Sequence, residues 1–150
     1  MLIPTTSSTC ASGRHGEPLA HAAIDLTGFA APQRAARGLV RDALSGIANQ
    51  DWVDDVTLAA DELVGNAYQH AGAAGEMGIA LDLYVWGATV QVSDGGADAG
   101  AVPDPPKVTD EQAEGGRGLF LVDSLATAWG VLASSTGKIV IAVFLHQAAG

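Results

Sequence analysis

The sequence predicts an α+β protein, a two-layer α/β sandwich in which three helices cover one face of a mostly antiparallel sheet. Two observations support this fold class. Segments with the 3.6-residue period of an amphipathic helix are interspersed with segments of strict apolar–polar alternation. Successive strand-like segments are joined by short turns, which indicates antiparallel pairing. With 150 residues, the chain is long enough for one domain with a substantial apolar core.

The first expected helix covers residues 32–47. Pro32 suits its first turn, and its apolar stripe extends to Ile47. A second stripe on this helix is basic and consists of Arg34, Arg37 and Arg41. Two interpretations of the basic stripe stay open: an ordinary solvated helix face, or a docking surface for an acidic partner.

Two further segments have helical periodicity. Residues 52–71 have apolar side chains at a 3.6-residue period, with Asp51 as the expected N-cap. The third helix is expected over residues 118–129, with Trp129 at the end of its apolar face.

Strand signals are clearest over residues 79–86, where alternation places Ile79 and Val85 on the same side as Leu81 and Leu83. Gly87 and Ala88 are expected to turn the chain. The other expected strands are 21–26 at an edge, 89–93, and a closing hairpin of 131–135 and 139–145.

Two segments lack periodicity. Residues 1–19 are rich in Ser, Thr, Gly and Pro and are expected to form a mobile tail, followed by one domain over residues 20–150. Residues 95–116 are rich in Gly, Pro and acidic side chains. A connection of this length within a compact domain is commonly functional, so we expect a lid over a site.

Composition excludes several classes of protein. Lys and Arg number 7 against 17 Asp and Glu, giving a net charge of −10, which argues against direct binding to nucleic acid. No segment approaches the roughly 18 apolar residues of a membrane helix, and no signal peptide is evident. The single cysteine, Cys10, allows no intrachain disulfide. A cytoplasmic protein is the resulting expectation.

The most informative motif lies on the second helix, where Glu62, Asn66 and His70 are spaced four residues apart. Residues at this spacing share a helix face. A carboxylate can orient or deprotonate a hydroxyl, and an amide oxygen one turn away can ligate a hard divalent cation such as Mg²⁺. Taken alone, Glu62 is also consistent with an exposed helix carboxylate. We assign His70 a structural role as a hydrogen-bond donor at the helix end.

Two glycine-bearing segments complete the pattern. Asp94 ends a strand before Gly95 and Gly96, and it is either a turn residue or a buried acceptor for an exocyclic amine. The second segment, Gly115–Leu119, directly precedes the third expected helix. Free N–H groups at a helix start bind anions, and Arg117 adds a positive charge. Together these segments suggest an ATP site.

Other nucleotide and catalytic motifs are absent from the sequence. Gly137-Lys138 is followed by Ile139, so there is no P-loop, and no Gly-x-Gly-x-x-Gly opens a helix after a strand. One cysteine and four histidines form no metal-binding pattern, and there is no Gly-x-Ser-x-Gly elbow.

In this order and spacing, the motifs resemble those of the Bergerat-fold ATPases, the superfamily of gyrase, a heat-shock chaperone, histidine kinases and a mismatch-repair protein. The resemblance covers roughly residues 32–145. The short form with Glu-Leu-Val-x-Asn-Ala-x-x-His from Glu62 and Gly-Arg-Gly-Leu-x-Leu-Val from Gly116 most resembles the bacterial anti-sigma-factor serine/threonine kinases.

The resemblance implies a role for each matching residue. Glu62 matches the general base, Asn66 the Mg²⁺ ligand, and Asp94 the aspartate that reads the adenine amine. Gly96 matches the glycine beside the ring. The second glycine motif around the phosphates is matched by Gly116, Arg117, Gly118 and Leu119, and Gly137 begins the last glycine motif. Asp98 departs from the pattern, because the family usually has a glycine there.

The resemblance therefore implies an ATP- and Mg²⁺-dependent serine/threonine kinase that acts as an anti-sigma factor. Its partners would be a sigma factor and an anti-sigma antagonist that it phosphorylates, and it would form a homodimer. Two alternatives stay open: a non-catalytic module whose partner binding depends on nucleotide, and the detached catalytic domain of a sensor histidine kinase.

Overall fold

The computed structural model describes residues 17–47, 49–71, 75–95, 114–133 and 137–146. The predicted tail and lid therefore lie largely outside the described residues. The elements follow in the order β1 (Ala20–Asp25), α1 (Pro32–Leu44), α2 (Gln50–Ala71), β2 (Met77–Tyr84), β3 (Gly87–Asp94), α3 (Glu114–Leu125), β4 (Ala128–Ala133) and β5 (Lys138–Leu145).

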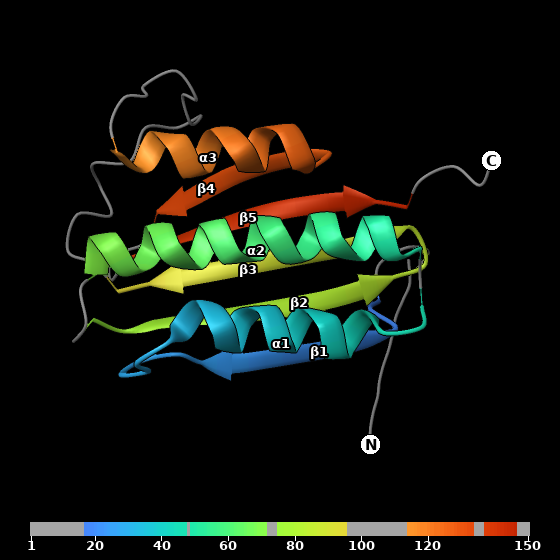
Figure 1. Ribbon diagram of the computed structural model, residues 1–150, viewed down its shortest axis with the longest axis horizontal. Coiled ribbons are helices and arrows are strands. Elements are labelled where there is room, and N and C mark those ends of the chain that lie inside the picture. Colours follow the sequence, from blue (N-terminus) through green and yellow to red (C-terminus); the bar gives the residue numbers. More distant parts are fainter. Residues whose placement is uncertain (1–16, 48, 72–74, 96–113, 134–136, 147–150) are drawn as a thin grey trace.

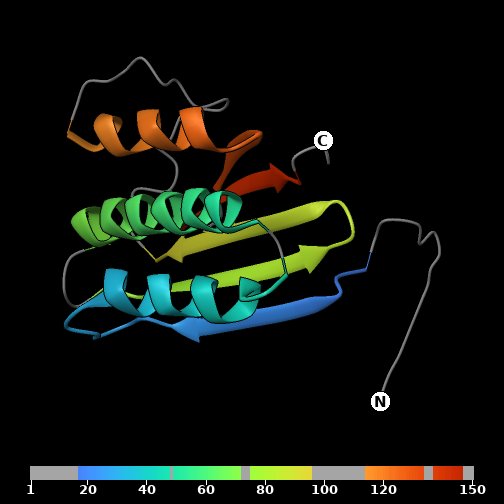
Figure 2. The same ribbon diagram turned by 45° about the vertical axis from the view of Figure 1, so that its right-hand side comes forward.

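The five strands form one sheet in the order β1-β2-β3-β5-β4, and every neighbouring pair is antiparallel. All three helices lie on the same face of the sheet, with α2 between α1 and α3 (Figure 1). The turned view shows the two layers, and none of the described helices covers the other face of the sheet (Figure 2). The predicted α+β fold, a two-layer sandwich with a mostly antiparallel sheet, is confirmed.

The apolar core lies between the layers. Alternate residues of the central strands point toward the helices, so Leu81, Val90 and Phe144 are almost completely buried. From the helical layer, Val56 and Val64 of α2 are fully buried. Burial of this continuous apolar surface is the main force that holds α2 across the middle of the sheet.

The ends of several elements differ from the sequence prediction. The first helix ends at Leu44, so Ile47 lies beyond it and is 48% exposed. Asn49 rather than Asp51 caps α2, because its Oδ1 accepts a hydrogen bond from the Trp52 amide at 3.1 Å. Gly87 and Ala88 begin β3 instead of forming the turn.

The turn between β2 and β3 instead contains Val85 and Trp86. Val85 was predicted to share a strand face with Leu81 and Leu83, but it is 68% exposed because the strand ends at Tyr84. The Trp86 ring stacks on that of Tyr84, with centroids 4.5 Å apart.

The third helix lies four residues earlier than predicted and covers Glu114–Leu125. Trp129 consequently belongs to β4, where its indole N–H donates to Asp123 Oδ1 at 2.9 Å. This contact links the end of α3 to the strand that follows it.

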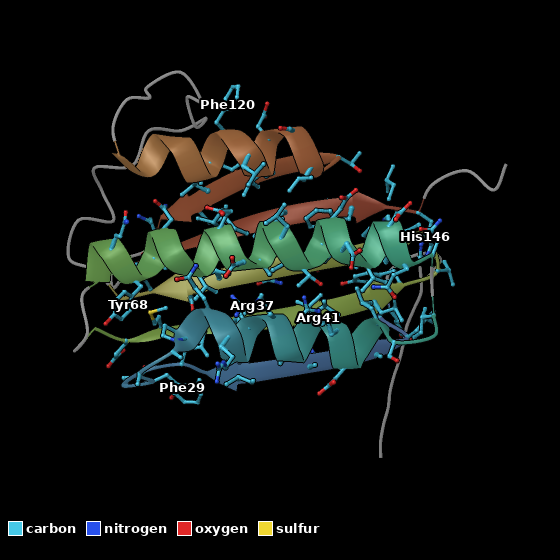
Figure 3. The ribbon with its side chains drawn as sticks, viewed as in Figure 1. Phe29, Arg37, Arg41, Tyr68, Phe120 and His146 are labelled. Atoms are coloured by element: carbon cyan, nitrogen blue, oxygen red, sulfur yellow. The ribbon has the colours of Figure 1, made fainter. Side chains whose placement is uncertain are left out.

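One aromatic contact fixes the start of α2 against the end of β5. The indole N–H of Trp52 donates to the Leu145 carbonyl at 3.0 Å, and its ring lies 4.7 Å from that of His146. In Figure 3, His146 marks this end of the molecule, opposite the end where Tyr68 is labelled.

Candidate functional site

The candidate site is built on the second half of α2. Apolar neighbours such as Leu63 and Val64 are buried and hold this part of the helix on the sheet. Asn66 shares their burial and is 8% exposed. Its Oδ1 atom makes no hydrogen bond to any part of the chain that the structure describes. A buried amide oxygen without a partner is costly, so this position suits an external donor or cation.

Glu62 lies one turn before Asn66 on the same helix face and is only partly buried. Partial desolvation raises the pKa of this carboxyl above its ordinary value, and the neighbouring Asp61 carboxylate raises it further. A raised pKa makes the ionised Glu62 carboxylate a stronger proton acceptor.

Side chains of α1 form hydrogen bonds with Asp61, the residue next to Glu62 in the sequence. The Arg37 guanidinium donates to Asp61 Oδ1 at 2.9 Å, and the Gln33 amide donates to the same oxygen and to the Asp61 carbonyl, at 3.0 and 3.1 Å. Arg37 is labelled in Figure 3, on the side of α1 that faces α2. One arginine of the basic stripe is therefore paired within the chain, while Arg34 and Arg41 are exposed.

Asp94 ends β3 on the core face, where it is 7% exposed. Its Oδ2 lies 3.7 Å from the Lys138 ammonium at the start of β5, and the two side chains are 4% and 12% exposed. The following amide, that of Gly95, donates to the Glu76 carbonyl at 2.9 Å. Asp94 is thus a buried ion-paired carboxylate, and the interpretation as a simple exposed turn residue does not fit it.

Gly137 allows β5 to approach Asp94 closely. A β-carbon placed on Gly137 would overlap the Asp94 carbonyl oxygen and crowd the Gly95 α-carbon. Only a residue without a side chain fits this position. Gly137 therefore fixes the distance between the two strands at the buried carboxylate.

The glycine segment before the third helix differs from its prediction. Gly116 and Gly118 were expected in a turn that precedes the helix, but both lie within the first turns of α3. The side chain of Arg117 and residue Gly96 lie outside the described part of the structure. Leu119 packs against the apolar core, so its proposed contact with nucleotide can involve only the exposed remainder of the residue or its backbone.

These elements meet at one end of the molecule. The C-terminal half of α2, the end of β3, and the starts of α3 and β5 all lie at the left of Figure 1. This topology brings Asp94 and Lys138 of adjacent strands to the same end as the Glu62–Asn66 face. A carboxylate that can accept a proton and an amide oxygen that can ligate a cation thus lie at the same end of the molecule as the buried ion pair.

Lys138 was missed as a site residue from the sequence, where it was assigned to a hairpin turn. The alternation of β5 contains the missing signal. Val140, Ala142 and Phe144 are buried on the core face, and Lys138 has the same parity. A lysine at an inward-facing strand position, in a chain with only 7 Lys and Arg residues, indicates that its ammonium is paired with an acidic side chain inside the fold.

Two kinds of feature are absent from the described residues. No three His, Cys, Asp or Glu side chains in that part of the chain lie close enough to hold a metal ion together. No helix among the described segments has the length and apolarity needed to cross a bilayer.

Comparison with known proteins assigns the family. Residues 30–144 match the family model of the histidine kinase-like ATPase domain. The chain belongs to this family. The predicted superfamily is thereby confirmed.

Curated relatives place this histidine kinase-like ATPase in a branch. It is 30% identical over 126 residues to the serine-protein kinase RsbW of Bacillus licheniformis, covering 73% of this chain and 79% of the relative. The RsbW of Bacillus pumilus is 30% identical over 129 residues with the same coverage. The predicted serine/threonine kinase branch is thus confirmed at the level of the family.

A solved structure supports the fold. The RsbU and RsbW domains of Rv1364c from Mycobacterium tuberculosis superpose with a TM-score of 0.62 at 21% identity. The match covers 85% of this chain but only 33% of the longer one. At this identity the likeness concerns the fold alone.

Proposed function

We propose that this ATPase-family protein binds Mg·ATP and phosphorylates a serine or threonine of an anti-sigma antagonist, and that it sequesters a sigma factor. The proposal rests on the buried Asn66 Oδ1, which lies one turn from Glu62 and has no hydrogen-bond partner among the described residues. Membership of the serine-protein kinase RsbW branch supports the reaction class. A cytoplasmic location follows, because ATP and sigma factors are found there.

Each site residue has a proposed role. Asn66 would ligate Mg²⁺ through its amide oxygen, and Glu62 would accept the proton of the attacking hydroxyl. Asp94 would accept a hydrogen bond from the adenine amine. The start of α3, with Gly116, Arg117 and Gly118, would lie against the phosphates. Bound Mg²⁺ would supply charge neutralisation at the transferring phosphoryl group.

Nucleotide binding provides the first test. The full chain should bind ATP more tightly with Mg²⁺ than with EDTA in calorimetry. Asn66→Ala removes the oxygen ligand and should lower Mg·ATP affinity by at least about tenfold, the scale on which supporting groups act in metal sites, while ATP affinity in EDTA stays near that of the wild type. Equal Mg²⁺ dependence in the two proteins would contradict the metal assignment.

Phosphoryl transfer provides the second test. Partners isolated with the full chain should include a sigma factor and a protein that gains acid-stable phosphoserine or phosphothreonine from labelled ATP. Binding without transfer would favour the nucleotide-dependent binding module. Acid-labile phosphohistidine on a partner would favour the catalytic domain of a histidine kinase.

We also propose a homodimer formed through the helix-free face of β4 and β5. Because the core face of β5 carries Val140, Ala142 and Phe144, its other face carries apolar residues as well. The exposed or half-buried set on this face is Leu132, Ile139, Ile141, Val143 and Leu145. Contiguous exposed apolar surface of this kind commonly marks an interface.

The dimer can be tested by placing a charge in the middle of this face. Ile141→Glu should convert the dimer to a monomer in sedimentation velocity, because an unpaired carboxylate would be buried at the interface. Ala23→Glu, at the opposite edge of the same sheet face, is the matched control and should sediment as the wild type does. A dimer that survives Ile141→Glu would contradict this interface.

A further inference from the structure

The pair formed by Asp94 and Lys138 shows features that a simple structural ion pair does not require. Both side chains are largely buried, and their charged atoms lie 3.7 Å apart. Removing two charges from water is costly, and apolar residues of similar volume commonly replace such pairs without loss of stability. The other core-facing residues of β5 are apolar, so a lysine at this position calls for a functional explanation.

The backbone fixes the two groups relative to one another. Asp94 and Lys138 are directly opposite in the register of β3 and β5, and both face the helical layer. Gly137 brings the strands into close contact immediately before Lys138. The carboxylate and the ammonium are therefore neighbouring acceptor and donor on two paired strands.

At 3.7 Å, the separation between the two charged atoms exceeds that of a direct hydrogen bond. The flexible stem of lysine allows its ammonium to turn toward a further acceptor while it stays close to the carboxylate. An ionised carboxylate only accepts hydrogen bonds, and an ammonium only donates them. The pair thus presents one acceptor and one donor side by side.

The Watson–Crick edge of adenine has the complementary pattern, with the exocyclic amine as donor and ring nitrogen N1 as acceptor. We propose that Lys138 is a second base-reading residue, donating to N1 while Asp94 accepts from the exocyclic amine. The inference rests on the proposed ATP site, and it adds a residue that selects the base.

The test pairs a change in the protein with a change in the ligand. Affinities are measured by calorimetry for Mg·ATP and for 1-deaza-ATP, in which a C–H group replaces N1. The wild-type protein should bind 1-deaza-ATP about tenfold or more weakly than ATP, the scale expected for a hydrogen bond from a charged donor. Lys138→Met should bind ATP more weakly and discriminate little between the two ligands. Lys138→Arg, which keeps a donor, should retain part of the discrimination.

Removing one member of a buried pair can destabilise the fold, so the variant Asp94→Asn/Lys138→Met is measured as well, with thermal unfolding as a check. It removes both charges, and it should bind ATP and 1-deaza-ATP equally. The role of Lys138 would be overturned if folded Lys138→Met or the double variant still preferred ATP over 1-deaza-ATP as strongly as the wild type does. It would also be overturned if the wild type bound the two ligands equally. Failure of the wild type to bind Mg·ATP at all would instead overturn the proposed function, and this inference with it.

Discussion

Glu62→Gln is expected to lower phosphoryl transfer to the cognate serine or threonine by a factor of about 10² to 10⁴, the usual contribution of a positioned general base. The glutamine keeps the shape of the side chain but does not accept a proton. Because Asn66 and Asp94 are unchanged, Mg·ATP affinity should stay near that of the wild type. Single-turnover transfer from labelled ATP, with calorimetry alongside, measures both quantities.

The pH dependence gives an independent check on the same residue. The folded-state pKa of Glu62 is raised, chiefly by desolvation and further by Asp61. The wild-type transfer rate should therefore fall, as the pH is lowered, at a higher pH than an ordinary glutamate would give. Asp61→Asn removes the neighbouring negative charge, so this acid limb should move to lower pH while most of the transfer is retained.

The raised pKa of Glu62 lowers the stability of the fold, although it favours proton transfer. A carboxyl whose pKa is higher in the folded state binds protons more readily there, so its ionised form lowers the free energy of unfolding. This loss of stability disappears as the pH falls through the folded-state pKa. The neutral Glu62→Gln should consequently have a melting temperature at pH 7 no lower than that of the wild type.

If Glu62→Gln is folded and transfers phosphate at the wild-type rate, Glu62 is not the general base.

Much of this fold follows from local pattern, because both helical and strand periods are properties of short segments. The ends of elements depend on other forces. Gly115–Gly118 was interpreted as a turn because glycine is a poor helix former, yet the first turn of a helix has unbonded amides and tolerates it. Trp129 satisfied the helical period but lies in β4, where its indole finds Asp123.

In the candidate site too, features local to one helix could be predicted from the sequence, whereas contacts between elements could not. The spacing of Glu62 and Asn66 is enough to predict a shared helix face, because that face is a local property of the helix. The pairing of Arg37 with Asp61 depends on how α1 packs on α2, and that of Lys138 with Asp94 depends on strand register. Register and packing are tertiary properties, so the sequence alone predicted neither contact.

The second large effect is expected at Gly137, where strand packing and the nucleotide site meet. Gly137→Ala would drive a methyl group into the Asp94 carbonyl oxygen and the Gly95 α-carbon. Since backbone atoms cannot move aside as the end of a flexible side chain can, β5 must shift away from β3. Overpacking of this kind costs about 1–3 kcal/mol, and sometimes more. The shift would also separate Lys138 from Asp94, so Mg·ATP affinity should fall even at temperatures where the variant is folded.

Two glycines of the same sheet separate these effects. A β-carbon on Gly87 would overlap the Phe144 carbonyl oxygen, at the opposite end of β3 and β5, whereas one on Gly130 meets no atom within 4 Å. Gly87→Ala should therefore lose stability in denaturant unfolding as Gly137→Ala does, but its folded form should keep ATP affinity, and Gly130→Ala should change neither property. Gly137→Ala with intact affinity, or with the stability of Gly130→Ala, would mean that close packing at Gly137 does not position Asp94. The three variants thus distinguish a strand contact that only supports the sheet from one that also shapes the base site.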